Sequence, residues 1–281
     1  MRKLLSANLS RLWKSRAFWL GLAAVFGLSV FSVLINCRMA MLDAESGFDY
    51  TLDACYFSFM PALSLFFSAF IRLFLGPEDS AGGLRGKIIA GHSRTDIYLA
   101  GLLTCMAGTA LYDAACLAGG LAGIPFLGVW QMSTPALMLC MATVFLSSLT
   151  LCAIFVLIGF LWENRAAAAV ASLLLAIGLI LAGSILYNLL CEPEFSSGVV
   201  ITAEGMTFGD PTPNPSYLAE PLRTVCRVLL NILPTGQAIM LTNVAEDESF
   251  VMPLLELIAS PLLVLGFSAG GAALFHRKDL K

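Results

Sequence analysis

Six apolar stretches, each long enough to cross a lipid bilayer, constrain this chain more than any other feature. The stretches lie at residues 18–35, 57–75, 97–124, 135–161, 166–190 and 250–275. A helix needs about 20 apolar residues to cross the hydrocarbon core of a bilayer. Only 12% of the residues are charged, whereas an average soluble domain has about 25%. The sequence therefore predicts an all-α polytopic membrane protein, with six transmembrane helices in a single membrane domain over residues 1–281.

The basic residues predict the orientation, because cytoplasmic loops of membrane proteins are enriched in Lys and Arg. With the amino end inside, the inner side receives 13 of the 16 Lys and Arg residues. Arg72 lies near the inner end of the second stretch, and we expect its side chain to snorkel to the inner interface. Both termini are predicted to be cytoplasmic, as an even number of spans requires.

Residues 1–17 have the pattern of an amphipathic helix. Leu4, Leu5, Leu9, Leu12 and Trp13 recur at helical spacing, with Arg and Lys between them. Basic helices that carry aromatic residues lie at the depth of the lipid headgroups. We expect this segment to lie on the inner surface of the membrane.

Residues 191–249 form the largest predicted extramembrane segment. Its Pro-rich and Gly-rich part at 209–217 (GDPTPNPSY) does not permit a regular helix, and helix is expected from about Leu218. Residues 225–241 are apolar enough for a seventh span, but they include polar and helix-breaking residues that are costly in lipid. These residues are Arg227, Asn231, Pro234, Gly236 and Gln237. We therefore expect an external or re-entrant helical hairpin, broken near Pro234, between spans five and six.

Two pairs of cysteines lie near the predicted outer surface. Cys37 and Cys55 flank the first outer loop, and Cys191 and Cys226 bracket much of the second. Either pair is a candidate disulfide in an oxidising compartment. The alternative, in which these cysteines are unpaired small residues at the membrane interface, stays open.

Two acidic residues, Asp113 and Glu256, fall within predicted spans. An ionisable residue inside a membrane is a candidate for function, here a cavity that accepts cationic groups. The alternative is a protonated or hydrogen-bonded residue that packs between helices. The only two histidines, His92 and His276, lie on the predicted inner side, and no metal-binding motif is present. The sequence therefore predicts no metal site and no enzymatic activity.

The inner loop at residues 76–96 contains Gly-Leu-Arg-Gly-Lys, which is similar to part of a phosphate-binding loop. That motif requires a glycine where this chain has Ala81, and Ser or Thr where it has Ile88. We therefore expect no nucleotide site here. The pattern instead predicts a short amphipathic helix over 84–90, a turn at Gly91, and a cap for the next span at Ser93 or Thr95. The alternative is a plain solvated loop.

This loop resembles the first inner loop of bacterial type-2 ABC exporter permeases. Gram-positive members often have Gly-Thr-Ile-Arg-Asn-Lys-Leu followed by Gly-His-Ser-Arg and Ile-Tyr-Leu. The matching positions are Gly83, Arg85, Lys87, Gly91, His92, Ser93, Arg94, Ile97, Tyr98 and Leu99. Leu84 and Gly86 depart from the pattern, so the local helix is expected to be weaker. Residues 233–238 (LPTGQA) and 275–281 (FHRKDLK) are similar to the family's Leu-Pro-Ser-Gly-Gln segment and Phe-Arg-Lys-Lys-Asp-Leu-Lys ending.

The resemblance implies a permease subunit of an ABC exporter in a bacterial cell membrane. Its partners would be a second permease copy or a related permease, and a cytoplasmic ABC ATPase that holds ATP and Mg; no nucleic acid is expected. The ATPase would dock on the inner loop and the amino-terminal helix. The implied coupling residues are Gly82, Gly83, Arg85, Lys87, Ile88, Ile89, Gly91, His92, Ser93, Arg94 and Tyr98. The basic ones would meet acidic positions on the ATPase, and both isoleucines would fill an apolar groove. Relatives handle antimicrobial peptides, lipophilic drugs and cell-envelope components, which favours an amphipathic substrate and a role in peptide-antibiotic resistance.

Two other classes of function remain open. A proton-coupled secondary transporter would use Asp113 or Glu256 as its proton carrier and would need no ATPase. A membrane scaffold or sensor subunit would move no substrate. The glycine-bounded inner loop favours the permease, because a secondary carrier has no need for such an element.

Overall fold

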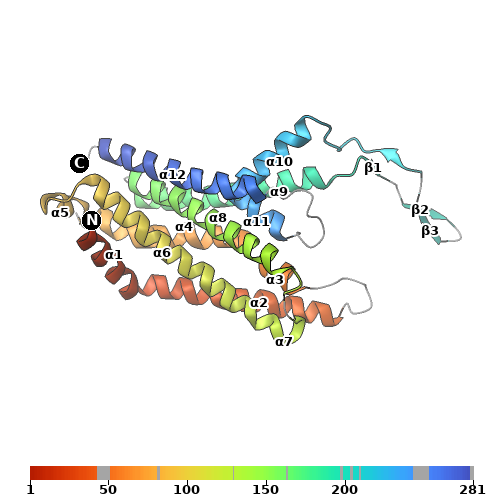
Figure 1. Cartoon of the computed structure of the whole chain (residues 1–281), viewed down its shortest axis with the longest axis horizontal. Coiled ribbons are helices and arrows are strands. Elements are labelled where there is room, and N and C mark those ends of the chain that lie inside the picture. The colour runs from red at the N-terminus through yellow and green to blue at the C-terminus, as the bar shows by residue number, and fades with distance from the viewer. Residues whose placement is uncertain are drawn as a thin grey trace.

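Long α-helices dominate the computed structural model (Figure 1). It describes residues 1–42, 51–80, 83–128, 130–162, 164–196, 199–202, 205–208, 210–242 and 253–278. In chain order, the first helices are α1 (Arg2–Lys14), α2 (Arg16–Leu42), α3 (Leu52–Phe57), α4 (Met60–Ser80), α5 (Gly83–Ile89), α6 (Arg94–Gly120), a 3-10 turn (Leu121–Gly123) and α7 (Ile124–Leu127). They are followed by α8 (Thr134–Leu161), α9 (Arg165–Cys191), α10 (Leu222–Ile232), α11 (Pro234–Thr242) and α12 (Pro253–Arg277).

Six helices in the described ranges are long and apolar enough to cross a membrane. They cover Arg16–Leu42, Leu52–Gly76, Arg94–Leu127, Thr134–Leu161, Arg165–Cys191 and Leu255–Arg277. Six apolar helices that could span a membrane are thus confirmed. A seventh span arises only if the bent pair α10 and α11 is counted as one crossing.

Both chain ends, α1 and α5 lie at one end of the helix bundle, and the β-strands lie at the other (Figure 1). We call these the terminal end and the hairpin end. Helix α8 lies inside the bundle and packs against α4, α6 and α12. Its buried face is built largely of small and aliphatic side chains, which let these neighbours approach closely.

The bent pair α10 and α11 enters the bundle. The two helices meet at 99°, and α11 is buried against α9, α8, α4 and α3. The Thr235 hydroxyl donates to the carbonyl of Leu179 over 2.7 Å. Leu179 lies about 18 Å from the carboxyl end of α9, at 1.5 Å per residue. A Cβ atom on Gly183 would lie 3.2 Å from the Gly236 backbone, so two glycines permit this approach. The bent pair therefore packs between the helices of the bundle, and the break lies close to the predicted position at Pro234.

Short strands, which were not predicted from the sequence, occupy part of the segment between α9 and α10. β1 (Phe195–Ser196) pairs with β4 (Thr212–Pro213), and β2 (Val199–Thr202) pairs with β3 (Gly205–Phe208), both antiparallel. Helix α10 begins at Leu222, later than predicted. The Glu220 carboxylate accepts hydrogen bonds from the Thr224 hydroxyl (2.6 Å) and from the Thr224 amide (3.1 Å), an amide in the first turn of α10 that has no partner within the helix. The bonds with Thr224 also hold the pKa of Glu220 below its usual value.

All eight cysteines are free, so neither candidate disulfide is formed. Cys191 is exposed at the end of α9. Cys226 is buried in a small apolar cluster with Leu190, Leu230 and Met240. Burial of Cys226 among apolar side chains fits the alternative of unpaired small residues.

We predict that residues at the two ends of the bundle react from opposite sides of the membrane. A membrane-impermeant maleimide should label Cys191 in intact cells, because this thiol is exposed at the hairpin end. In a Cys191→Ser background, Ile89→Cys should be labelled only after the cells are permeabilised. Labelling of Ile89→Cys in intact cells would contradict the six-span topology with cytoplasmic termini.

Candidate functional site

The inner loop folds into helix α5, a short element with a defined end. Leu84 is buried in the core, which fixes one face of the helix. Gly91 has a φ of +86°, a left-handed conformation that favours glycine. Its amide donates to the carbonyl of Ile88 (2.9 Å), and the amide of His92 donates to the carbonyl of Lys87 (3.1 Å). These two bonds satisfy carbonyls that the end of the helix would leave unpaired.

Helix α6 starts directly after this turn. The Ser93 hydroxyl accepts a hydrogen bond from the amide of Asp96 over 3.0 Å, which confirms Ser93 as the cap. Asp96 lies in the first turn of α6, where a carboxylate favours the positive end of the helix dipole. Capping hydrogen bonds therefore fix the turn both at the end of α5 and at the start of α6.

Helix α1 supports α5 from the side. Leu4, Asn8 and Leu12 form one buried stripe of α1. The Lys87 ammonium donates to the amide oxygen of Asn8 over 3.3 Å. The guanidinium of Arg11 lies 4.2 Å from the ring centre of Phe74 on α4, a cation–π contact. The predicted amphipathic helix is thus present, and it packs against the terminal end of the bundle.

Arg94 and Lys278 connect the terminal ends of three helices. Arg94 donates to the carbonyls of His276 (3.1 Å) and Lys278, at the carboxyl end of α12. The Lys278 ammonium donates to the carbonyl of Phe160, near the end of α8, over 3.0 Å. Arg94 was expected to face an acidic partner, but in this structure it binds within the chain, because the carbonyls at the end of α12 need donors.

Tyr98 is also a packing residue. Its ring is buried against Phe160 and Phe275, with centroids 5.1 Å and 6.3 Å away. Its hydroxyl donates to the carbonyl of Phe267 on α12, over 3.5 Å. Tyr98 therefore joins α6 to α12 and is not part of a docking surface.

The two isoleucines of α5 have different surroundings. Ile88 packs against the core of the bundle, whereas Ile89 is 86% exposed. Arg85 and Gly86 are exposed as well, and Lys87 and His92 are half-buried. Gly83 is half-buried, and Gly82 lies outside the described residues. The expectation that both isoleucines fill a partner's groove is thus corrected, since only Ile89 is free to do so.

The two intramembrane acids lie in different packing environments. Asp113 on α6 accepts a hydrogen bond from the Ser148 hydroxyl of α8 over 3.0 Å. Its second oxygen, Oδ2, is buried with no hydrogen-bond partner among the described residues. Glu256, in the first turn of α12, is 2% exposed. Its Oε1 likewise has no partner in the described ranges. Each acid therefore keeps one carboxyl oxygen that a proton or a cationic group can occupy.

Gln237 connects the bent pair α10 and α11 to α12. Its side-chain NH₂ donates to the carbonyl of Asn231 at the end of α10 over 2.7 Å. Its side-chain oxygen accepts from the Ser260 hydroxyl of α12 over 3.1 Å. Pro234, the first residue of α11, needs no amide partner at that position. The sequence pointed to Pro234, Gly236 and Gln237, and their role in this structure is to fix the break inside the bundle.

Sequence reasoning missed Asn8, Ser148 and Ser260. Each is a polar residue on a buried helix face that hydrogen-bonds a site residue on another helix. Asn8 had a detectable signal, because it falls in the stripe between Leu4 and Leu12 where an apolar residue is expected. Serine in apolar helices is too common for Ser148 and Ser260 to be recognised in this way.

No protein-family model matches this chain, and comparison with curated proteins gives no significant match. In the part of the chain that the structure describes, no group of three or more His, Cys, Asp or Glu side chains is arranged to hold a metal ion.

We predict opposite effects for two glycine substitutions in the inner loop. Gly91→Ala forces a side chain into a positive φ and should destabilise the end of α5 by about 1–2 kcal/mol. Gly86→Ala meets no atom within 4 Å and should stabilise the helix by about 0.5–1 kcal/mol. Hydrogen exchange of the α5 amides should be faster in the first variant and slower in the second. Equal exchange in both variants would contradict the capped helix.

Proposed function

We propose that this chain is the membrane-spanning permease subunit of an ATP-driven ABC exporter in a bacterial cell membrane. It would expel an amphipathic substrate, such as a peptide antibiotic, a drug or a lipid-like molecule, as one of a pair of permeases. ATP and Mg would bind to a separate cytoplasmic ATPase. The observation that carries this proposal is Ile89, a large apolar side chain that is 86% exposed on a capped helix at the terminal end of the bundle.

Ile89 is the residue on which docking would depend. Burying one Ile side chain contributes roughly 1.5–3 kcal/mol, whereas an exposed ion pair contributes about 0–1 kcal/mol. Arg85, exposed on the same helix, would set the orientation of the partner more than its affinity. Lys87 and Arg94 already bind within the chain and would instead keep α5 and α6 in place.

The contacts around α5 supply a path for the motion of the ATPase. Displacement of α5 would reach α1 through Lys87 and Asn8, and α6 through the turn at Gly91. From α6 it would reach α12 through Arg94 and Tyr98. Ser260 of α12 also binds Gln237 of the bent pair α10 and α11. A displacement of α5 at the terminal end would therefore also shift the bent pair inside the bundle.

We predict that Ile89→Asp abolishes co-purification of the ATPase and ATP-driven transport, while the protein still inserts in the membrane. Ile89→Ala should weaken binding of the ATPase by roughly tenfold, since it removes most of the apolar side chain. The measurements are pull-down of the tagged ATPase and its stimulated ATPase rate in proteoliposomes. Ile88 is unsuitable for this test, because it packs against the core and its substitution would disturb the fold.

Ala166→Asp is the matched control. It places the same charge at the terminal end, on an exposed residue in the first turn of α9, where an acid is tolerated. This control should keep normal coupling. If Ile89→Asp bound and stimulated the ATPase as the control does, the permease proposal would be rejected.

The second candidate is a proton-coupled transporter, favoured by the buried carboxyl oxygens of Asp113 and Glu256 that have no described hydrogen-bond partner. In that mechanism a proton would bind each oxygen on one side of the membrane and leave on the other. A third candidate, a scaffold or sensor subunit, would move no substrate in any assay.

We predict that Asp113→Asn and Glu256→Gln retain ATP-driven transport in proteoliposomes that lack a proton gradient. The neutral amides keep the shape of each side chain and avoid burying a charge. Transport would be followed with a fluorescent cationic peptide, with and without a protonophore. The opposite result would be transport that proceeds without an ATPase, requires the proton gradient and is lost in either variant. That result would establish a proton-coupled transporter instead.

A further inference from the structure

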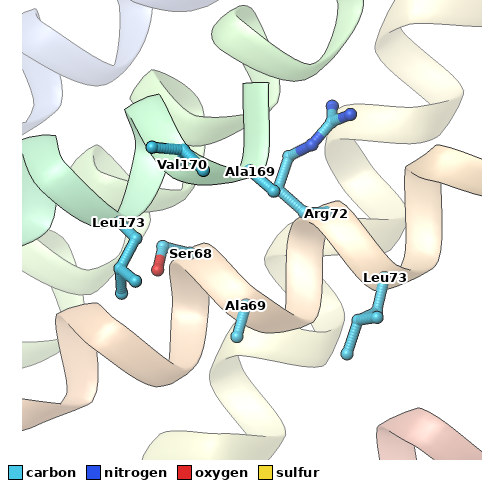
Figure 2. Close-up of a pocket in the computed structure, with 7 residues that line it drawn as sticks. All are labelled: Ser68, Ala69, Arg72, Leu73, Ala169, Val170 and Leu173. Atoms are coloured by element: carbon cyan, nitrogen blue, oxygen red, sulfur yellow. The ribbon is translucent and has the colours of Figure 1, made fainter. Parts of the chain in front are cut away.

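A groove lies between α4 and α9 on the outer surface of the bundle (Figure 2). It has a volume of about 320 Å³. It is lined by Ser68, Ala69, Arg72, Leu73, Ala169, Val170 and Leu173. Leu73 and Val170, on opposite walls, are 60% and 57% exposed. The groove therefore opens toward the surroundings of the bundle, not toward its core.

Small residues on both walls help to form the groove. Ala69 on α4 and Ala169 on α9 leave space that larger side chains would fill. Ser68 forms part of the floor, and its hydroxyl already donates to the carbonyl of Leu65 over 2.8 Å. The guanidinium of Arg72 points away from the groove in Figure 2 and donates to the carbonyl of Gly159. What the groove presents to an occupant is therefore almost entirely hydrocarbon.

The basic side chain of Arg165 lies beyond the end of the groove that is nearer the terminal end of the bundle. A Cβ atom on Gly76 of α4 would lie 3.9 Å from the Cδ atom of Arg165, so these two residues mark the same level of the bundle. Leu73 lies about one turn from Gly76 on α4, and Ala169 lies about one turn from Arg165 on α9. At 1.5 Å per residue, the groove therefore lies about 5–12 Å from Arg165 along the bundle, in the direction of the hairpin end. The Nη2 atom of Arg165 is buried and has no hydrogen-bond partner among the described residues. The Arg165 side chain as a whole is only half-buried, so its positive charge would attract an anionic group at the depth of the lipid headgroups.

We propose that this groove binds an anionic phospholipid of the leaflet at the terminal end. One acyl chain lies along Ala69, Leu73, Val170 and Leu173, and the phosphate binds Arg165. Water does not suit the site, because an apolar cavity without polar partners stays dry. An empty groove would lose the dispersion contacts that an acyl chain supplies.

A second copy of this chain fits the groove less well. In a dimer whose twofold axis passes through the groove, the two grooves would meet and leave a void between them. Two Arg165 side chains would also approach each other, and like charges repel in a low-dielectric setting. An anionic lipid would fill the groove with an acyl chain and neutralise Arg165 with its phosphate. This inference depends on membrane insertion and not on the permease proposal.

The test is native mass spectrometry of the full chain released from nanodiscs of phosphatidylcholine and phosphatidylglycerol. Wild-type protein should retain phosphatidylglycerol in preference to phosphatidylcholine. Arg165→Gln should reduce that preference by roughly fivefold, the ratio expected for one Arg near a headgroup. Ala169→Trp should fill the groove and abolish retention of both lipids.

Two matched controls accompany these variants. Ala167→Trp adds the same bulk to an exposed position of α9 outside the groove, and Arg277→Gln removes an exposed charge at the end of α12. Both should retain lipid as the wild type does. Equal lipid retention in Arg165→Gln, Ala169→Trp and the controls would overturn the proposal. A shift from dimer to monomer in Ala169→Trp with unchanged lipid would also overturn it and would assign the groove to an interface between copies.

Discussion

Basic side chains that donate to backbone carbonyls of other helices hold this bundle together at its ends. Arg94 binds the carboxyl end of α12, and Lys278 binds the end of α8. Arg72 reaches the same end of α8 through Gly159, and Arg223 donates to the carbonyl of Leu190 on α9 over 2.7 Å. The last carbonyls of a helix have no partner within that helix and carry the negative end of its dipole. A cation from a neighbouring helix therefore satisfies both requirements and fixes the two helices relative to each other.

At the break between α10 and α11, side chains and close backbone packing satisfy the same requirement. A broken helix inside hydrocarbon is tolerated only where protein groups satisfy its backbone. Gln237 returns to the carbonyl of Asn231 across the break, while Thr235 and Ser260 attach the hairpin to α9 and α12. Close approach of Gly236 to Gly183 makes room for these bonds. Of the residues that made a seventh span unfavourable in the sequence, Asn231, Gly236 and Gln237 thus take part in the contacts at the break.

Properties that depend on local sequence were predictable, and properties that depend on tertiary partners were not. The apolar stretches, the cap at Ser93 and the turn at Gly91 follow from hydropathy and from backbone preferences. The burial of α11 did not, since hydropathy does not distinguish a segment at the surface from one between helices. The β-pairing before α10 rests on short strands with too few residues for a periodic signal.

The inner loop shows the same limit at the scale of neighbouring residues. Ile88 and Ile89 are identical, adjacent residues with the same helix propensity. Helix α5 nevertheless directs Ile88 toward the core and Ile89 outward. Which face is outward depends on Leu84 and on Lys87, whose partner Asn8 lies in another helix. The same packing explains why the basic residues of the loop are not equivalent. Lys87 and Arg94 hold the loop in place, whereas Arg85 stays exposed. The outward isoleucine therefore lies on a helix that is held in place by contacts with α1, α4 and α6.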